Sequence, residues 1–97
     1  MTDEPPIELP IEDSLDLHAF APRDVPSVLE EYLAAASAAG FAEVRIIHGR
    51  GRGVQRARVR ALLARCPLVL RAWEAEPGRG GWGATIVELK GGTREAP

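Results

Sequence analysis

Two histidines and one aspartate are the residues of this chain best suited to acid–base or metal chemistry. His18 and His48 are its only histidines, and each stands at the end of a predicted strand. Asp16 lies two residues before His18, so the two side chains would share one face of the first strand. Such a pair could hold a divalent metal ion, or could divide the roles of base and acid on a phosphodiester. The alternative is an exposed polar strand end. Because ligands bind beyond the carboxyl ends of parallel strands, the two histidines are expected to converge.

Three glycines follow His48 directly. Gly49, Gly51 and Gly53 alternate with Arg50 and Arg52, between a predicted strand and a predicted helix. Free backbone N–H groups and the positive end of a helix attract phosphate at such a place. The spacing matches neither a Walker loop nor the dinucleotide fingerprint, which disfavours a nucleotide cofactor. The alternative is a tight turn that needs positive φ angles.

The aromatic residues and the single cysteine give weaker signals. Trp82 stands among glycines in residues 80–83, where it could stack on a base or cap the core, and we expect it to be exposed. Trp73 lies inside a predicted strand and is expected in the core. Cys66 is expected to be a small buried apolar residue, and not a nucleophile.

The charges are distributed unevenly along the chain. Residues 1–43 hold ten acids and one base, whereas residues 44–73 hold eight arginines and no acid. Planar arginines suit bidentate recognition of phosphate, although a genome that favours arginine codons would give the same bias. The acidic first part would repel a polyanion, so binding is expected on one face only.

Length and composition predict one small domain. The chain has 97 residues, of which 45% are apolar and 27% charged. One cysteine allows neither an internal disulfide nor a multi-cysteine metal cluster, and indicates a reducing compartment, so we expect a cytoplasmic protein. No segment has the length of a membrane span or the pattern of a secretory leader, so no membrane association is expected.

The hydrophobic pattern predicts six elements after an extended acidic tail. The tail covers residues 1–13, and the domain covers 14–90, with a second tail at 91–97. Strands are predicted at 14–18, 43–48, 68–74 and 84–89, with a glycine-rich loop at 77–83. One helix begins at Asp24 with Pro26 in its first turn and is capped by Gly40; the other begins after Gly53 and ends before Pro67. The order β-α-β-α-β-β predicts an α/β fold, a two-layer sandwich with a four-stranded mixed sheet, two helices on one face and the other face partly open.

Three short motifs resemble those of the Smr (small MutS-related) domain. They are Leu15-Asp-Leu-His18, Ile47-His-Gly-Arg-Gly51 and Gly80-Gly-Trp-Gly-Ala-Thr85, in that order along nearly the whole domain. The resemblance implies a free-standing bacterial member with the same two-layer fold. Several members of the family nick DNA or cleave RNA with stimulation by divalent metal. The chain departs from the pattern at Ala19, where many members have glycine, and this is expected to alter the turn into the first helix.

The resemblance also implies site residues. Asp16, His18 and His48 would be catalytic, with His48 as general acid/base or phosphate ligand, and with Asp16 and His18 holding Mg²⁺ or Mn²⁺ or orienting water. The expected contacts to phosphate or nucleic acid are made by Gly49, Arg50, Gly51, Arg52, Gly53, Arg56, Arg60, Gly81, Trp82 and Gly83.

Three functions compete at this point. The first is a metal-assisted endonuclease acting on DNA or RNA, which needs His48 for chemistry. The second is a non-catalytic module that grips backbone phosphate or single strands through arginines and Trp82. The third is a protein-interaction domain that uses the acidic first part. DNA or RNA is the expected partner, and a monomer is the expected state.

Overall fold

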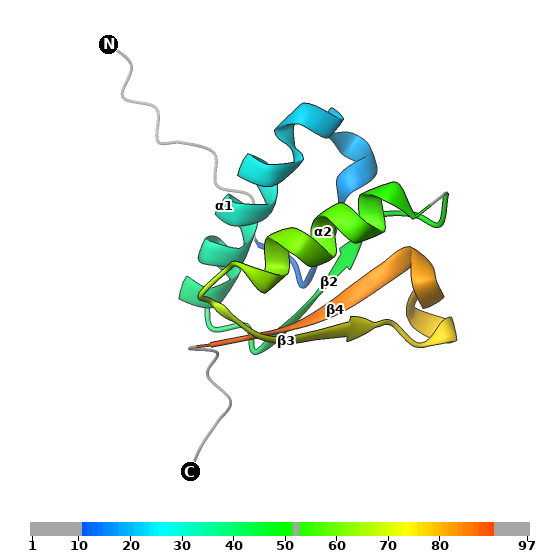
Figure 1. Ribbon diagram of the computed structural model, residues 1–97. Coiled ribbons are helices and arrows are strands. Elements are labelled where there is room, and N and C mark those ends of the chain that lie inside the picture. Colours follow the sequence, from blue (N-terminus) through cyan, green and yellow to red (C-terminus); the bar gives the residue numbers. More distant parts are fainter. Residues whose placement is uncertain (1–10, 52, 91–97) are drawn as a thin grey trace.

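The computed structural model describes residues 11–51 and 53–90 (Figure 1). Most of the predicted tail at 1–13, the tail at 91–97 and Arg52 lie outside the described residues. The helices and strands are β1 (Ser14–Asp16), α1 (Val25–Ala38), β2 (Glu43–Ile47), α2 (Val54–Ala64), β3 (Val69–Glu74) and β4 (Ala84–Leu89). Short 3₁₀ turns at Leu17–Ala19, Pro22–Asp24, Pro77–Arg79 and Gly81–Gly83 connect them. The predicted order β-α-β-α-β-β is confirmed.

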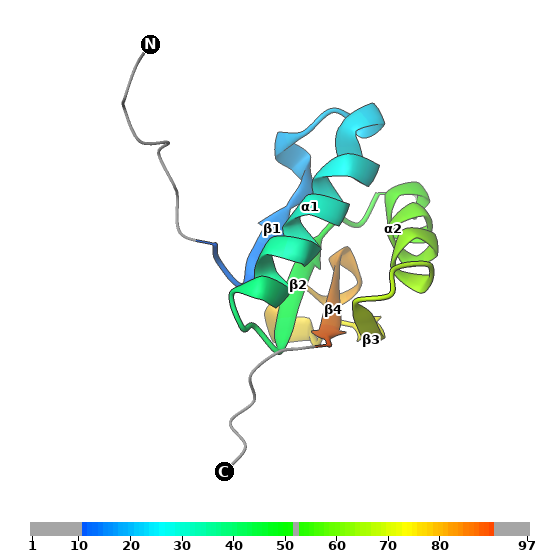
Figure 2. The same ribbon diagram turned by 90° about the vertical axis from the view of Figure 1, so that its left-hand side faces the viewer.

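The four strands form one mixed sheet in the order β1-β2-β4-β3. β1 and β2 are parallel, whereas β4 runs antiparallel to both of its neighbours. Both helices pack on the same face of the sheet (Figure 2). The predicted two-layer sandwich is therefore confirmed, and β4 is inserted between two strands that precede it in the sequence.

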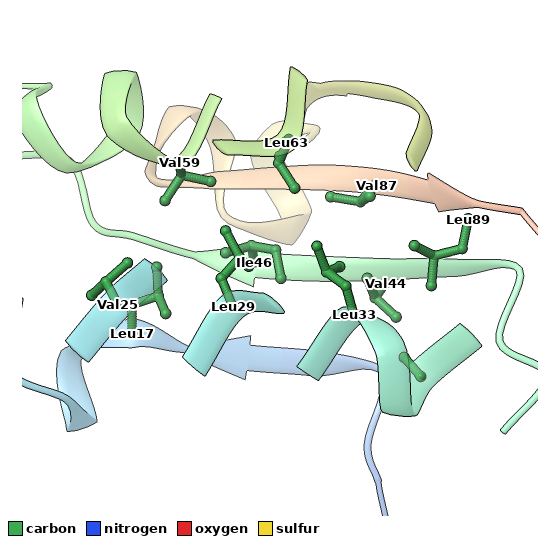
Figure 3. Packing of buried hydrophobic residues seen from close by; sticks show 11 residues of the cluster. Leu17, Val25, Leu29, Leu33, Val44, Ile46, Val59, Leu63, Val87 and Leu89 are labelled. Atoms are coloured by element: carbon green, nitrogen blue, oxygen red, sulfur yellow. The ribbon is translucent and has the colours of Figure 1, made fainter. Parts of the chain in front are cut away.

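The core lies between the helices and this face of the sheet (Figure 3). α1 buries Leu29 and Leu33, one turn apart, and α2 buries Val59 and Leu63 with the same spacing. The facing strand positions are also apolar and buried: Val44, Ile46, Val87 and Leu89. Truncating Leu29 or Leu33 to alanine would cost about 2–5 kcal/mol of stability, because each is almost fully buried. This layer holds the ends of β1, β2 and β4 in fixed positions.

The helix boundaries follow the predicted signals. Gly40, just beyond α1, has φ +93, and Gly53, just before α2, has φ +84, both in the left-handed region that favours glycine. Pro26 occupies the first turn of α1, and α2 ends before Pro67. Asp24 precedes α1 as predicted, but among the described residues its side chain makes no capping hydrogen bond.

Two strands end earlier than predicted. β1 was expected to reach His18 but ends at Asp16, because Asp16 Oδ1 accepts the N–H of His18 at 2.9 Å and starts a 3₁₀ turn. β2 was expected to include His48 but ends at Ile47, and the His48 N–H goes to the carbonyl of Gly83 instead. Both histidines therefore sit just beyond their strands, at the same edge of the sheet.

Trp73 corrects a core prediction. It lies on the edge strand β3 and remains 36% exposed, on the face opposite the helices, where it pairs with Ile86. The Arg71 guanidinium stacks on its ring at 5.3 Å from the centroid. Cys66, by contrast, is half-buried and packs against the core.

The face without helices is partly covered by the chain itself. Ala75, Ala84 and Ile86 are buried there, and Arg45 Nη1 donates to the carbonyl of Arg79 at 3.0 Å in the segment before β4. At the other end of the described chain, the carbonyl of Asp13 accepts the N–H of Arg45 at 2.9 Å. No helix within residues 11–51 and 53–90 combines the length and the apolar character that crossing a membrane requires.

Candidate functional site

A cleft of about 420 Å³ opens beyond the ends of β1 and β2, in front of α2. The turn from β2 into α2 and the loop before β4 lie side by side there (Figure 1). The cleft is lined by His18, His48, Gly49, Arg50, Gly51, Gly53, Val54, Gln55 and Arg56. The two histidines meet in this cleft, as their places at strand ends predicted.

Asp16 and His18 form an exposed pair at the rim of the cleft. His18 Nδ1 lies 2.7 Å from Asp16 Oδ1, and the side chains are 66% and 57% exposed respectively. The backbone and ring N–H groups of His18 hold the pKa of Asp16 below its usual value, so this carboxylate is ionised. An ionised carboxylate only accepts hydrogen bonds. Neutral His18 therefore carries its proton on Nδ1 and its lone pair on Nε2.

Nε2 of His18 lies against the backbone of Gly49. A Cβ atom placed on Gly49 would stand 2.8 Å from this nitrogen, closer than any real contact, and the φ of Gly49 is +86. Glycine is required here for both reasons. The basic nitrogen of His18 thus faces the turn that begins at Gly49 and leads into α2, which we call the glycine turn.

His48 lies at the floor of the cleft and is only 5% exposed. Its Nδ1 lies 3.0 Å from the carbonyl of Gly49 and its Nε2 lies 2.9 Å from Thr85 Oγ1. Burial lowers the pKa of His48 below its usual value, and the charges of Arg56 and Arg60 lower it further, while the bond to Gly49 opposes them. His48 is therefore neutral at pH 7, with both ring nitrogens engaged.

The start of the glycine turn is hydrogen-bonded to the residue that precedes β4. The N–H groups of His48 and Gly49 both donate to the carbonyl of Gly83, at 3.0 and 2.9 Å. The side chain of Arg50 lies over this segment, because a Cβ on Gly81 or Gly83 would stand 3.1 Å from its atoms. Gly81 and Gly83 were expected to contact nucleic acid, but both are buried, and their missing side chains make room for Arg50.

Arg56 and Trp82 stack beside the turn. The Arg56 guanidinium stands 4.8 Å from the Trp82 ring centroid, and its Nη2 lies 3.6 Å from Glu74 Oε1. Trp82 is 38% exposed, as predicted, and its ring edge lies 3.7 Å from the Cβ position of Gly53. This stack is worth about 0.5–2 kcal/mol and holds the aromatic ring at the rim of the cleft.

The structure does not bring every predicted phosphate ligand to the cleft. Arg60 turns to a separate groove between α2 and β3, and its Nε lies 3.5 Å from Thr85 Oγ1. Sequence reasoning gave no role to Thr85, which is fully buried and bonded to His48. Its place as the last residue of the third motif was the available signal.

The described residues include no group of three or more His, Cys, Asp or Glu side chains that could hold a metal ion. Asp16 and His18 offer two ligands at most, and His18 is bonded to one carboxylate oxygen of Asp16. Mg²⁺ is often bound through one or two carboxylates, with water and substrate phosphate completing the shell. These two residues would fit only a divalent ion of that kind, with Asp16 as its ligand from the protein.

The motifs and the fold agree with comparisons to known proteins. Eighty residues are 38% identical to the endonuclease MutS2 of Clostridium tetani, covering 82% of this chain and 10% of that protein. The corresponding protein of Halalkalibacterium halodurans is 40% identical over 80 residues, again covering 82% of this chain and 10% of that protein. The chain thus spans about a tenth of the length of these curated relatives.

Two solved structures share the fold. The crystal structure of the Smr domain of Thermus thermophilus MutS2 matches with a TM-score of 0.76 and 32% identity, covering 81% of this chain and 99% of that chain. YdaL, a stand-alone small MutS-related protein from Escherichia coli, matches with a TM-score of 0.76 and 30% identity, covering 82% of this chain and 66% of that chain. The family model of the Smr domain matches residues 15–90. Because this match covers most of the chain, including the cleft and all of the sheet except Ser14, the chain belongs to the Smr domain family.

Proposed function

We propose that this chain binds nucleic acid in the cleft and hydrolyses a phosphodiester bond of the bound strand. One observation carries the proposal: the lone pair of His18, fixed by Asp16, faces the glycine turn at the start of α2. The relatives named endonuclease MutS2 support the same class of reaction.

The cleft suits a phosphate group. Backbone N–H groups at the start of α2 carry the positive end of the helix dipole. Arg50 and Arg56 line the same cleft. A bound phosphate would therefore accept hydrogen bonds from backbone N–H groups and from guanidinium groups together. Such hydrogen bonds are charge-assisted and stronger than those between neutral groups.

His18 is the base in the proposed reaction. Its Nε2 takes a proton from the attacking water as the water oxygen bonds to phosphorus and the ester P–O bond breaks, and the leaving oxygen takes a proton from solvent to become an alcohol. Asp16 accepts the Nδ1–H bond throughout, which orients the ring and stabilises the imidazolium that forms. A divalent ion, Mg²⁺ or Mn²⁺, would be held by Asp16 and substrate phosphate, and would offset negative charge on the phosphoryl oxygens.

Cleavage assays test this function. Supercoiled plasmid and labelled single-stranded RNA are incubated with wild-type protein and with His18→Ala, in Mg²⁺, in Mn²⁺ and in EDTA. Cleavage that is lost in the variant supports the proposal, and the EDTA arm shows whether the metal is needed. Equal products with both proteins would contradict it.

A binding module without cleavage is the second candidate, because the Arg56–Trp82 stack needs no reaction to hold a strand. An unpaired base could stack on Trp82, which is worth about 1–3 kcal/mol per base. Salt-sensitive binding of single strands without cleavage in any metal would favour this candidate.

A further inference from the structure

The buried imidazole of His48 occupies a single tautomer. A carbonyl oxygen can only accept, so the contact to Gly49 requires the proton on Nδ1. Nε2 then carries the lone pair, and the hydroxyl of Thr85 must donate to it. Since Thr85 is fully buried, solvent does not compete with Nε2 for the proton of its hydroxyl.

This arrangement leaves His48 poorly suited to proton transfer. Each nitrogen is already bonded within the protein, and His48 as a whole is buried, whereas the side chain of His18 is largely exposed. A proton could reach Nε2 only after the buried bond to Thr85 is lost. The acid–base role expected from the sequence is better filled by His18.

The bond from His48 instead fixes one peptide plane. The described peptide bonds are trans, so the carbonyl and the following N–H point in opposite directions. The Gly49 carbonyl is drawn inward to His48 Nδ1, and the Arg50 N–H of the same peptide therefore points away from the imidazole. If this peptide turned over, its carbonyl oxygen would take the place of a donor and would repel phosphate.

The backbone around this peptide leaves it few other supports. Gly49 has a φ of +86, in the left-handed region that favours glycine. Because glycine has no side chain, no steric contact of its own restricts the rotation of this peptide. The N–H groups of His48 and Gly49 are fixed by Gly83, but these bonds hold the peptide planes before the Gly49–Arg50 plane. Gly83 also packs against that plane, because a Cβ there would stand 3.5 Å from the Gly49 carbonyl carbon and 3.6 Å from the Arg50 nitrogen. The hydrogen bond that sets the direction of the Gly49 carbonyl comes from His48.

We propose that His48 and Thr85 form a positioning pair, in which the Thr85 hydroxyl donates to Nε2 and holds the imidazole in place, and His48 holds the Gly49–Arg50 peptide with its N–H available to a phosphate oxygen. The part of this proposal that concerns phosphate rests on the proposed function. The tautomer of His48 and the hydrogen bond that its Nε2 accepts from Thr85 stand independently of it.

Nitrogen-15 NMR of the imidazole tests the tautomer directly. Wild-type protein should show a protonated Nδ1 and an unprotonated Nε2 for His48. In Thr85→Val, which keeps the shape and removes the hydroxyl, Nδ1 should stay protonated, and the signal of Nε2 should shift because that nitrogen no longer accepts a hydrogen bond. Thr85→Ser should restore the wild-type pattern. An unchanged pattern in Thr85→Val would overturn the role of Thr85, and if that variant does not fold, the wild-type and Thr85→Ser spectra still test the tautomer.

Two substitutions of His48 test the peptide. The amide nitrogen of His48→Asn can stand where Nδ1 stands, whereas that of His48→Gln reaches the place of Nε2. Affinity for a fluorescent single-stranded DNA oligonucleotide in EDTA should fall about tenfold or more in His48→Gln and Thr85→Val, and less in His48→Asn and Thr85→Ser. Turnover on a cleavable strand is measured in parallel.

The outcomes separate the two proposals. Full affinity in both His48 variants, with turnover lost in both, would make His48 a proton-transfer residue and overturn the positioning role. Wild-type protein that neither binds nor cleaves any strand would refute the proposed function, while the NMR result would still decide whether Thr85 donates to Nε2 of His48.

Discussion

His18 Nδ1 and Asp16 Oδ1 lie 2.7 Å apart, and the same carboxylate oxygen also accepts the backbone N–H of His18 at 2.9 Å. One oxygen thus ends β1, starts the 3₁₀ turn and sets the tautomer of the histidine. The pair is exposed, so it adds little to the free energy of unfolding. Its main effect is to orient the imidazole ring and to set its tautomer.

Replacing Asp16 by asparagine should lower turnover by about a hundredfold or more, because the imidazolium that forms on His18 loses its carboxylate. KM should change less than turnover, because Asp16 does not line the cleft and would reach the strand only through a divalent ion shared with a phosphate. Steady-state kinetics on a labelled strand measures both constants. Asp24→Asn is the matched control, because Asp24 is exposed and lies before α1. Equal losses in the two variants would argue against the pair.

Gly49→Ala should lower the free energy of unfolding by about 1–3 kcal/mol, because alanine is strained at φ +86 and its Cβ would collide with His18 Nε2. Cleavage should also fall, since the ring must move away from the turn. Urea unfolding and the cleavage assay measure the two effects. Gly78→Ala is the control, since no atom of the described chain comes within 4 Å of a Cβ there. A fully stable Gly49→Ala protein would contradict the geometry.

The stability of the protein should fall as the pH drops below the ordinary histidine pKa of 6.5, because of His48. Its pKa is lowered in the folded state, so the unfolded chain takes up a proton first, and this uptake favours unfolding. His48→Asn should therefore lose less stability than wild type between about pH 7.5 and about pH 5.5. Urea unfolding at both pH values gives the comparison. Identical losses would show that His48 does not contribute in this range.

Arg56→Ala should weaken binding of single-stranded DNA and reduce the slope of log affinity against log salt by about one, if Arg56 contacts a phosphate. The variant also removes the partner of Trp82, so the tryptophan fluorescence should change. Fluorescence titrations at several salt concentrations measure the slope. Arg65→Ala removes the same charge from the separate groove between α1 and α2 and should leave the slope unchanged. A slope that changes equally in both variants would point to general charge instead of a site.

The periodicity of apolar residues predicted the elements well, because it reports which face of a helix or strand is buried. The stripe of Val59, Leu62 and Leu63 predicted α2, and the structure buries Val59 and Leu63 there, one turn apart. Periodicity carries no information about which strands are neighbours, so the insertion of β4 between β2 and β3 became visible only in the structure. Trp73 was misplaced for the same reason: its strand is at the edge, and its face lacks helices.

The site was predictable in its members but not in their roles. Strand ends predicted that His18 and His48 converge, since this depends only on the order of elements. The difference between them depends on Thr85, which lies 37 residues after His48 in the sequence and reaches it only through the pairing of β2 with β4. Local spacing cannot report such a contact.

The bonds from His48 and Gly49 to the carbonyl of Gly83 also limit how this turn could be reused in protein engineering. A designer who grafts residues 48–53 alone onto another scaffold would transfer a loop whose shape is imposed from outside. The start of β4 would have to be carried with it, with glycine at 81 and 83 so that Arg50 can lie across the backbone. The smallest portable unit is therefore two segments joined across a sheet, and not a single loop.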